Sequence, residues 1–312
     1  MKKSWLNSLL LSFILVVFAG CSNGEEVTST KEVKSDNESY SVIDDRGEEI
    51  SFEKVPETVI SLQPSNTEIL FAIGAGDKVI GATEYDNYPE EAKEIKRVSD
   101  SMTVNAEEVI ALKPEVVIAY TTGDDAGVKQ LEEAGLNVFV IQSAQTFEDV
   151  YGDIEQIATV MGVEKKGNEL VDGIKQQISD VKEKVSTLKE KEQVYFEISP
   201  SPDIYTAGAE TFQQEILETA GVENIFVDQK GWVKVGEEEI IKRNPNMILT
   251  TVGYVDEPTA EIKSRESWKD VNAVQNGQVY FLDSDIMSRP GPRIGEAVEL
   301  TAKTVYPDLF SE

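Results

Sequence analysis

The chain has 312 residues, of which 40% are hydrophobic and 28% are charged, as in an ordinary globular protein. Its formal charge of −29 argues against a nucleic-acid partner, because binding phosphates needs a basic surface. The chain contains no histidine and one cysteine, Cys21. This composition excludes an internal disulfide, a thiolate metal cluster and any histidine-dependent hydrolase, and it predicts no metal site.

Residues 1–20 have the layout of a secretory signal peptide. Two lysines precede an apolar run, residues 9–19, that is shorter than the roughly 20 residues needed to span a bilayer. The residues before Cys21 read Phe-Ala-Gly, which resembles a bacterial lipobox, so we expect a lipid on Cys21. Residues 21–40 are polar and predict a flexible tether. An ordinary signal peptide followed by a stray cysteine is the alternative.

Beyond the tether, short apolar strands alternate with helical stretches, which predicts an α/β protein with mostly parallel sheets. A β-hairpin is predicted around the turn Asp45-Arg46-Gly47. Further strands are predicted at residues 59–62, 79–81, 116–120 and 138–141, with helices between them. We assign residues 41–165 to a first α/β lobe.

One long amphipathic helix is predicted in the middle of the chain. From about residue 169 to 191, apolar residues recur at every third or fourth position between Lys and Glu. We assign residues 166–191 to a helix that links two lobes; a coiled coil with a partner helix is the alternative. Residues 192–312 then form a second α/β lobe, with strands predicted at 194–196, 247–251 and 279–282.

Two stretches of the chain occur twice, in the same order. EEVIALKPEVVI (107–118) resembles EEIIKRNPNMIL (238–249), and TEILFAIGAG (67–76) resembles QEILETAGVE (214–223). The repeat predicts two similar lobes with a cleft between them and an equivalent glutamate, Glu107 or Glu238, at the start of a helix in each. Two such glutamates predict a two-point docking surface. The plainer interpretation is that acids favour helix N-termini, by about 0.3–1 kcal/mol each.

Three stretches resemble the substrate-binding proteins of ABC importers for cobalamin, haem and ferric siderophores. They are SLQPSNTEILFAIGAGDKVIGATEYDNYP (61–89), NAEEVIALKPEVVIAY (105–120) and SRPGPRI (288–294). The cobalamin-binding members look most similar, through SNTE followed by Tyr-x-x-Tyr-Pro and through Trp232. The resemblance implies two lobes, each a mostly parallel sheet flanked by helices, bridged by one long rigid helix. It also implies a binding protein, with no catalytic residues and no cofactor.

The resemblance implies roles for individual residues. Glu107 and Glu238 match glutamates that meet arginines on the permease, and their neighbours Glu108 and Glu239 could share that role. Tyr85 and Trp232 match aromatic residues that pack on the corrin ring. The full set of expected ligand-binding residues is Tyr85, Tyr120, Tyr205, Trp232, Asp285 and Arg289.

The chain departs from the cobalamin-binding pattern in one place. Those proteins have a tryptophan after the Val-Ser that is residues 98–99 here, whereas this chain continues Asp100-Ser101-Met102. One stacking surface is therefore missing or supplied elsewhere, and a haem or ferric-siderophore ligand stays open. Met102 would ligate haem iron from one side, and Arg289 and Arg293 are the basic candidates for an anionic siderophore.

These observations together predict a monomeric, lipid-anchored protein on the extracellular face of the cell membrane, in an organism expected to be Gram-positive. It would deliver cobalamin or a related corrinoid to an ABC permease dimer. A secreted hydrolase with paired carboxylates is the alternative from another class, but the sequence places no two acids in a recognisable acid and base arrangement.

Overall fold

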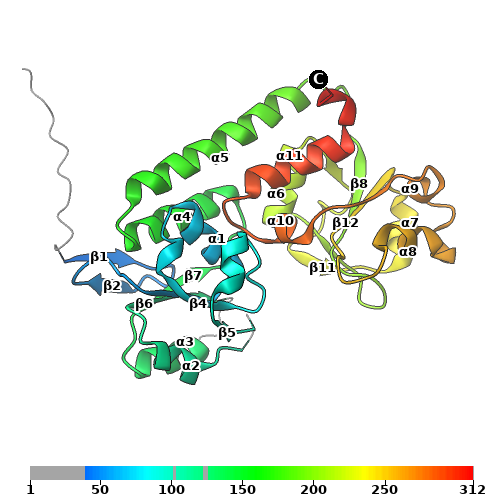
Figure 1. Ribbon diagram of the computed structural model, residues 1–312. Helices are drawn as coiled ribbons and strands as arrows, with labels where there is room; N and C mark the ends of the chain where they lie inside the picture. The colour runs from blue at the N-terminus through cyan, green and yellow to red at the C-terminus, as the bar shows by residue number, and fades with distance from the viewer. Residues whose placement is uncertain (1–38, 101–102, 122–125, 312) are drawn as a thin grey trace, which may run out of the picture. The chain divides into compact units, whose positions relative to one another are not determined.

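The computed structural model describes residues 39–100, 103–121 and 126–311 (Figure 1). The expected signal peptide, Cys21, nearly all of the expected tether and Met102 lie outside the described residues. In the part of the chain that is described, no helix is both long enough and apolar enough to cross a membrane.

The described chain begins with the predicted hairpin, formed by β1 (Tyr40–Ile43) and β2 (Glu49–Phe52). The Asp44 carboxylate accepts hydrogen bonds from the backbone amides of Arg46 and Glu48 and so closes the turn. Gly47 has a φ of +82°, a conformation that glycine adopts without strain.

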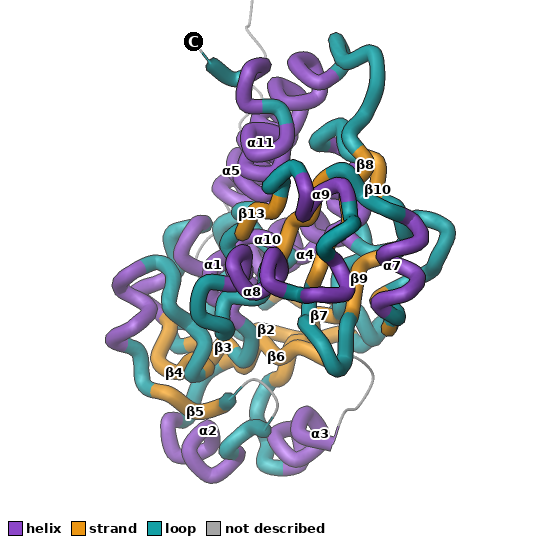
Figure 2. The backbone as a smooth tube through the Cα atoms, turned by 90° about the vertical axis from the view of Figure 1, so that its right-hand side faces the viewer, coloured by secondary structure: helices purple, strands orange, loops and turns teal. Residues whose placement is uncertain are grey.

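The first lobe contains a sheet of five parallel strands in the order β5-β4-β3-β6-β7. The strands are β3 (Val59–Ser61), β4 (Val79–Thr83), β5 (Arg97–Ser99), β6 (Val116–Thr121) and β7 (Val138–Gln142). The helices are α1 (Pro64–Ala72), α2 (Ala106–Leu112), α3 (Ala126–Glu133) and α4 (Phe147–Val160). Helices α1 and α4 lie on one side of this sheet, and α2 and α3 lie on the other (Figures 1 and 2).

The second lobe contains a sheet of four parallel strands in the order β10-β8-β12-β13, and an antiparallel pair, β9 and β11. The strands are β8 (Gln193–Glu197), β9 (Tyr205–Ala207), β10 (Glu223–Asn224), β11 (Trp232–Lys234), β12 (Met247–Thr250) and β13 (Val279–Phe281). The helices are α6 (Phe212–Thr219), α7 (Glu237–Arg243), α8 (Pro258–Ser264), α9 (Asn272–Gln275), α10 (Ser284–Ser288) and α11 (Ile294–Val305). The predicted α/β fold with parallel sheets is confirmed.

The long helix between the two sheets is α5 (Glu164–Val185). It packs against α4 of the first lobe and against α6 and α11 of the second, so helices of its own chain cover its apolar stripe. The helix ends at Val185 and not at residue 191. The hydroxyls of Ser186 and Thr187 donate to the backbone carbonyls of Glu183 and Lys184, a local pattern that competes with helix continuation.

Side chains alternate between the two faces of each sheet, as a β-strand requires. In β6, Val116 and Ile118 face a different core cluster from that of Val117. In β8, Val194 and Phe196 likewise belong to the first cluster, and Tyr195 belongs to a third. The clusters of Val117 and Tyr195 are therefore each confined to one lobe, whereas the first cluster contains residues of both lobes.

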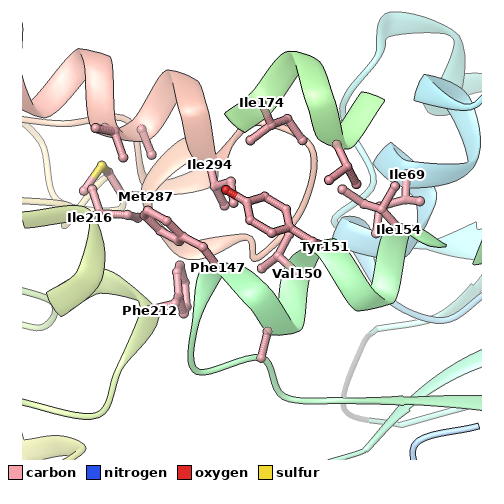
Figure 3. Packing of buried hydrophobic residues seen from close by; sticks show 14 of the residues in the cluster. Ile69, Phe147, Val150, Tyr151, Ile154, Ile174, Phe212, Ile216, Met287 and Ile294 are labelled. Carbon is pink, nitrogen blue, oxygen red and sulfur yellow. The ribbon is translucent and has the colours of Figure 1, made fainter. Parts of the chain in front are cut away.

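The shared cluster runs through the helices that join the lobes (Figure 3). Phe147 and Tyr151 of α4 lie beside Ile294 of α11, and Phe212 of α6 and Met287 of α10 complete the contact. All of these side chains are buried. Pulling the lobes apart would expose this apolar surface at about 25 cal/mol per Å², so the packing limits lobe movement.

Candidate functional site

In open α/β sheets, ligands bind in the loops beyond the carboxyl ends of the parallel strands. In the first lobe this edge carries Tyr85, which follows β4, and Tyr120, which lies near the end of β6. In the second lobe, Asp285 follows β13. The sequence-predicted ligand residues of both lobes therefore include positions at the edge where such a site is expected.

Tyr85 is 59% exposed and projects from a tightly held loop. The buried carboxylate of Asp86 accepts hydrogen bonds from the backbone amide and the hydroxyl of Thr83, at 2.8 and 2.5 Å. The Tyr85 amide donates to the same hydroxyl at 3.2 Å. This network fixes the backbone and leaves the Tyr85 ring at the surface. Tyr88 of the same motif instead lies under the guanidinium of Arg293, 4.2 Å from the ring centroid.

Trp232 and Tyr205 come from the antiparallel pair in the second lobe. The register pairs Trp232 with Ala207 and Tyr205 with Lys234, so both aromatic residues lie on one face of the ribbon. Trp232 is 43% exposed and Tyr205 is 39% exposed. The Trp232 indole donates to the Gln213 side chain at 3.1 Å, which holds the ring in one orientation. Two partly exposed aromatic side chains are thus available on this face of the second lobe.

The two expected rim residues of the second lobe both contact the first lobe. Arg289 donates from Nη1 to Glu68 Oε1 at 2.8 Å and from Nη2 to the Tyr85 carbonyl at 2.9 Å. Asp285 accepts from the Asn87 amide at 2.7 Å and pairs with Arg289 at 3.0 Å. Asp285 and Arg289 therefore join the Tyr85 loop to the second lobe.

Arg293 shares the carboxylate that Arg289 contacts. Its Nε and Nη2 donate to Glu68 at 2.8 and 2.6 Å, and Glu68 is 2% exposed. Both arginines that the sequence offered for an anionic ligand thus neutralise an acid of the protein itself. This pairing weakens the argument for a ferric-siderophore site.

Tyr120 is less accessible than the other aromatic candidates. Burial raises the pKa of its phenol, and the charge of Asp153 raises it further, whereas a hydrogen bond with Ser143 lowers it. Burial, followed by the charges of Asp45 and Asp149, raises the pKa of Asp153 to about 8. Asp153 lines a pocket of about 500 Å³ beyond the end of β7, together with Ser143 and both of these aspartates.

Two exposed aromatic residues at the same sheet edge were missed by the sequence analysis. Tyr254 follows β12 and is 75% exposed, and Phe281 ends β13 and is 44% exposed. Gly253 lies close to the Phe281 ring: a Cβ atom added to this glycine would be 3.5 Å from the ring. Tyr254 lies three residues after the predicted strand 247–251, and Phe281 lies near the end of the predicted strand 279–282; these positions at strand ends were the signal that could have found them.

The two predicted docking helices have matching ends. The residue after α2, the C-cap Lys113, has a φ of 52°, and the residue after α7, the C-cap Asn244, has a φ of 47°. A proline follows each of these residues, at positions 114 and 245. Because proline disfavours the right-handed helical conformation in the residue before it, the repeated Pro explains why both helices stop at the same place.

The neighbouring glutamates at the start of α2 and of α7 differ from each other in the same way in both helices. Glu107 and Glu238 are exposed and have no ion pair among the described residues. Glu108 pairs with Lys96, and Glu239 pairs with Arg243 of its own helix at 2.9 Å. Within the described residues, Glu107 of α2 and Glu238 of α7 are thus exposed first-turn carboxylates at matching positions, and neither has an ion pair.

The sequence profile of the periplasmic binding protein family matches residues 59–286. The chain belongs to this family. Its members are solute-binding proteins and not enzymes. The chain is thus a substrate-binding protein of the ABC-importer class, and this class implies a permease partner and a small-molecule ligand.

Two curated relatives cover most of the chain. An uncharacterized ABC transporter substrate-binding lipoprotein of Bacillus subtilis, YvrC, is 41% identical over 312 residues, 98% of this chain and 97% of that protein. The vitamin B12-binding protein of Vibrio cholerae is 29% identical over 246 residues, 78% of this chain and 87% of that protein.

Solved structures share the fold. A possible iron-binding, periplasmic solute-binding protein from Staphylococcus epidermidis has a TM-score of 0.73 at 36% identity, covering 81% of this chain and 100% of that chain. The vitamin B12-binding protein BtuF of Vibrio cholerae has a TM-score of 0.68 at 27% identity, covering 82% and 99%. The haem-binding protein RhuT from Roseiflexus has a TM-score of 0.75 at 21% identity, covering 81% and 99%, a likeness of fold alone.

Proposed function

We propose that the chain captures cobalamin or a related corrinoid between its two lobes and delivers it to an ABC permease. The observation that carries the proposal is the pair of exposed aromatic residues, Tyr85 and Trp232, contributed by different lobes. A corrin ring offers large apolar faces for stacking. Its amide fringe needs a small number of polar partners, of the kind that Asp285 provides.

The charge distribution supports a corrinoid over an anionic iron chelate. Arg289 pairs with Glu68 and Asp285, and Arg293 pairs with Glu68, so two carboxylates of the protein offset the two guanidinium charges. The chain as a whole carries a formal charge of −29. A haem would lack its commonest protein ligand, because the sequence has no histidine. Vitamin B12-binding proteins are also among the relatives of this chain.

Delivery is assigned to a different part of the molecule. We assign permease docking to Glu107 and Glu238, whose carboxylates are exposed at equivalent helix starts and make no ion pair with any residue that the structure describes. Arginine binds carboxylates through two parallel hydrogen bonds, which makes it the matching residue on a permease. We assign the lipid anchor to Cys21, on the extracellular face of the membrane; a relative from Bacillus subtilis is named a lipoprotein.

Visible absorption of the purified protein tests the ligand. The protein is incubated separately with cyanocobalamin, haem and a ferric siderophore, then desalted. Corrin bands retained at about one equivalent per chain are expected, as for a single site between two lobes. Retention of haem or the siderophore alone would overturn the corrinoid assignment and would direct attention to Met102 or to the two arginines.

A further inference from the structure

Glu68 belongs to the first lobe, but the hydrogen bonds to its carboxylate come from the second. It lies in α1 and is buried. Arg289 and Arg293 donate three hydrogen bonds to it, at 2.8, 2.8 and 2.6 Å. These arginines flank the loop between α10 and α11. Glu68 is therefore a buried, charge-assisted contact between the lobes.

Glu215 makes the reverse contact. It lies in α6 of the second lobe, and its Oε2 accepts a hydrogen bond from the backbone amide of Phe147 at 2.7 Å. Phe147 is the first residue of α4 in the first lobe. The first amides of a helix have no partner within the helix. The capping box of α4, Thr146 with Asp149, satisfies other amides and leaves this one to Glu215.

The two glutamates occupy equivalent positions in the internal repeat. Glu68 is the glutamate of Thr-Glu-Ile-Leu at 67–70, and Glu215 is that of Gln-Glu-Ile-Leu at 214–217. Each side chain crosses from its own lobe to the other. The contacts also flank the shared core: Phe147 and Ile294, the neighbour of Arg293, lie close together in it (Figure 3).

The hydrogen bonds of Glu68 and Glu215 fix the angle and distance between the lobes, which the shared apolar core does not do by itself. Apolar packing resists separation of the lobes, but it is non-directional and tolerates small rotations. Charge-assisted hydrogen bonds have narrow distance and angle requirements. Through Arg289, Glu68 is also connected to the Tyr85 carbonyl, so the position of that loop depends on where the second lobe sits.

We propose that Glu68 and Glu215 are positioning residues that hold the two lobes at one separation and thereby slow ligand release. Neither needs to touch the ligand. The part of this inference that concerns release rests on the proposed corrinoid function; the part that concerns lobe separation does not.

Distance measurements between the lobes test the inference without any ligand. The full chain with Cys21→Ser receives spin labels on cysteines at Glu133 of α3 and Lys263 of α8, which are both exposed. The starting chain should give one narrow distance distribution. Glu68→Gln and Glu215→Gln should each broaden it, and the double variant should broaden it most.

The controls separate positioning from general destabilisation. Glu218→Gln removes an exposed acid from the same helix as Glu215 and should leave the distribution unchanged. Glu68→Asp keeps the charge and should restore part of the narrow distribution if Glu68→Gln folds poorly. An unchanged distribution in the folded Glu215→Gln chain, or in a folded Glu68→Gln chain, would overturn the inference.

Dissociation kinetics test the effect on release. Cyanocobalamin should leave the Glu215→Gln chain roughly fivefold faster, the size expected when a charge-assisted hydrogen bond becomes a neutral one, with little change in association rate. An unchanged dissociation rate would overturn the link to release. If the unaltered chain retains no cyanocobalamin, the proposed function fails, and the spin-label distances still decide the positioning role.

Discussion

Two buried acids, one in each lobe, have different surroundings. In the second lobe, Glu197 is 1% exposed, and Arg265 donates to both of its oxygens, at 2.7 and 3.0 Å. In the first lobe, Asp153 is 6% exposed and lies near two other aspartates, with no basic partner among the described residues. Glu107 and Glu238, to which docking is proposed, have in contrast matching positions and exposure in the two lobes. The lobes are therefore alike at the proposed docking residues and differ in the partners of these two buried acids.

Removing the partner of the second-lobe acid should have the largest effect on stability. Arg265→Met would leave Glu197 buried without a counter-charge, which costs about 3–5 kcal/mol of unfolding free energy. Arg265 also lies over the Trp268 ring, 4.4 Å from its centroid, so the apolar replacement keeps part of the packing. Urea unfolding measures the loss. A change below about 1 kcal/mol would mean that Glu197 takes up a proton in place of its partner.

Reversing the charges of Glu107 and Glu238 should prevent the proposed docking to the permease. Glu107→Lys with Glu238→Lys should reduce uptake of labelled cyanocobalamin by about 100-fold or more, because like charges across an interface cost several kcal/mol. The two single variants should reduce uptake by similar amounts, because the two sites are equivalent, and each should reduce it less than the double variant does. Glu218→Lys is the matched control. A loss of ligand affinity in the double variant would show that these glutamates serve the ligand site.

Neutralising the unpartnered acid of the first lobe should stabilise the protein at high pH. The pKa of Asp153 is raised to about 8 from its ordinary 3.8, so between these values the folded chain binds a proton that the unfolded chain does not. The unfolding free energy therefore falls as the pH rises through this window. Asp153→Asn should remove that fall, which is about 3–4 kcal/mol between pH 5 and pH 8 at 1.36 kcal/mol for each pH unit.

Urea unfolding at pH 5 and pH 8 measures this difference. Asp172→Asn, which replaces an exposed aspartate on α5, is the matched control and should change little at either pH. An equal effect of Asp153→Asn at both values would show that its carboxyl does not titrate in this range.

Replacing one aromatic residue of each lobe by alanine tests the two sides of the proposed ligand site separately. Trp232→Ala should weaken cyanocobalamin binding by about 1–3 kcal/mol through lost stacking, and Tyr85→Ala should weaken it by about 1 kcal/mol because its ring is smaller. Calorimetric titration measures both. Unchanged affinity in the Trp232→Ala chain would remove that residue from the site.

Local patterns explain what could be predicted from the sequence. The hairpin turn, the parallel strands and the ends of α2 and α7 follow from residues close together in the chain, such as the prolines after Lys113 and Asn244. The long helix followed from its apolar period, but its end at Val185 did not, because Ser186 and Thr187 interrupt it through hydrogen bonds that periodicity does not register.

Contacts between distant residues could not be predicted from such patterns. Glu68 and Arg289 are 221 residues apart, and nothing in either local sequence indicates that they pair. Arg289 was expected at a ligand rim, a role that stays a prediction, but the structure adds its contacts with Glu68 and the Tyr85 loop. Tyr254 was missed because its exposure depends on a loop conformation after β12.

A crystal structure of the chain with cyanocobalamin tests the central claim most directly. The account predicts one corrin ring between the side chains of Tyr85 and Trp232, with Glu68 still bound by Arg289 and Arg293. A corrin ring on the outer face of one lobe, or a Trp232 side chain with no ligand contact, would contradict it.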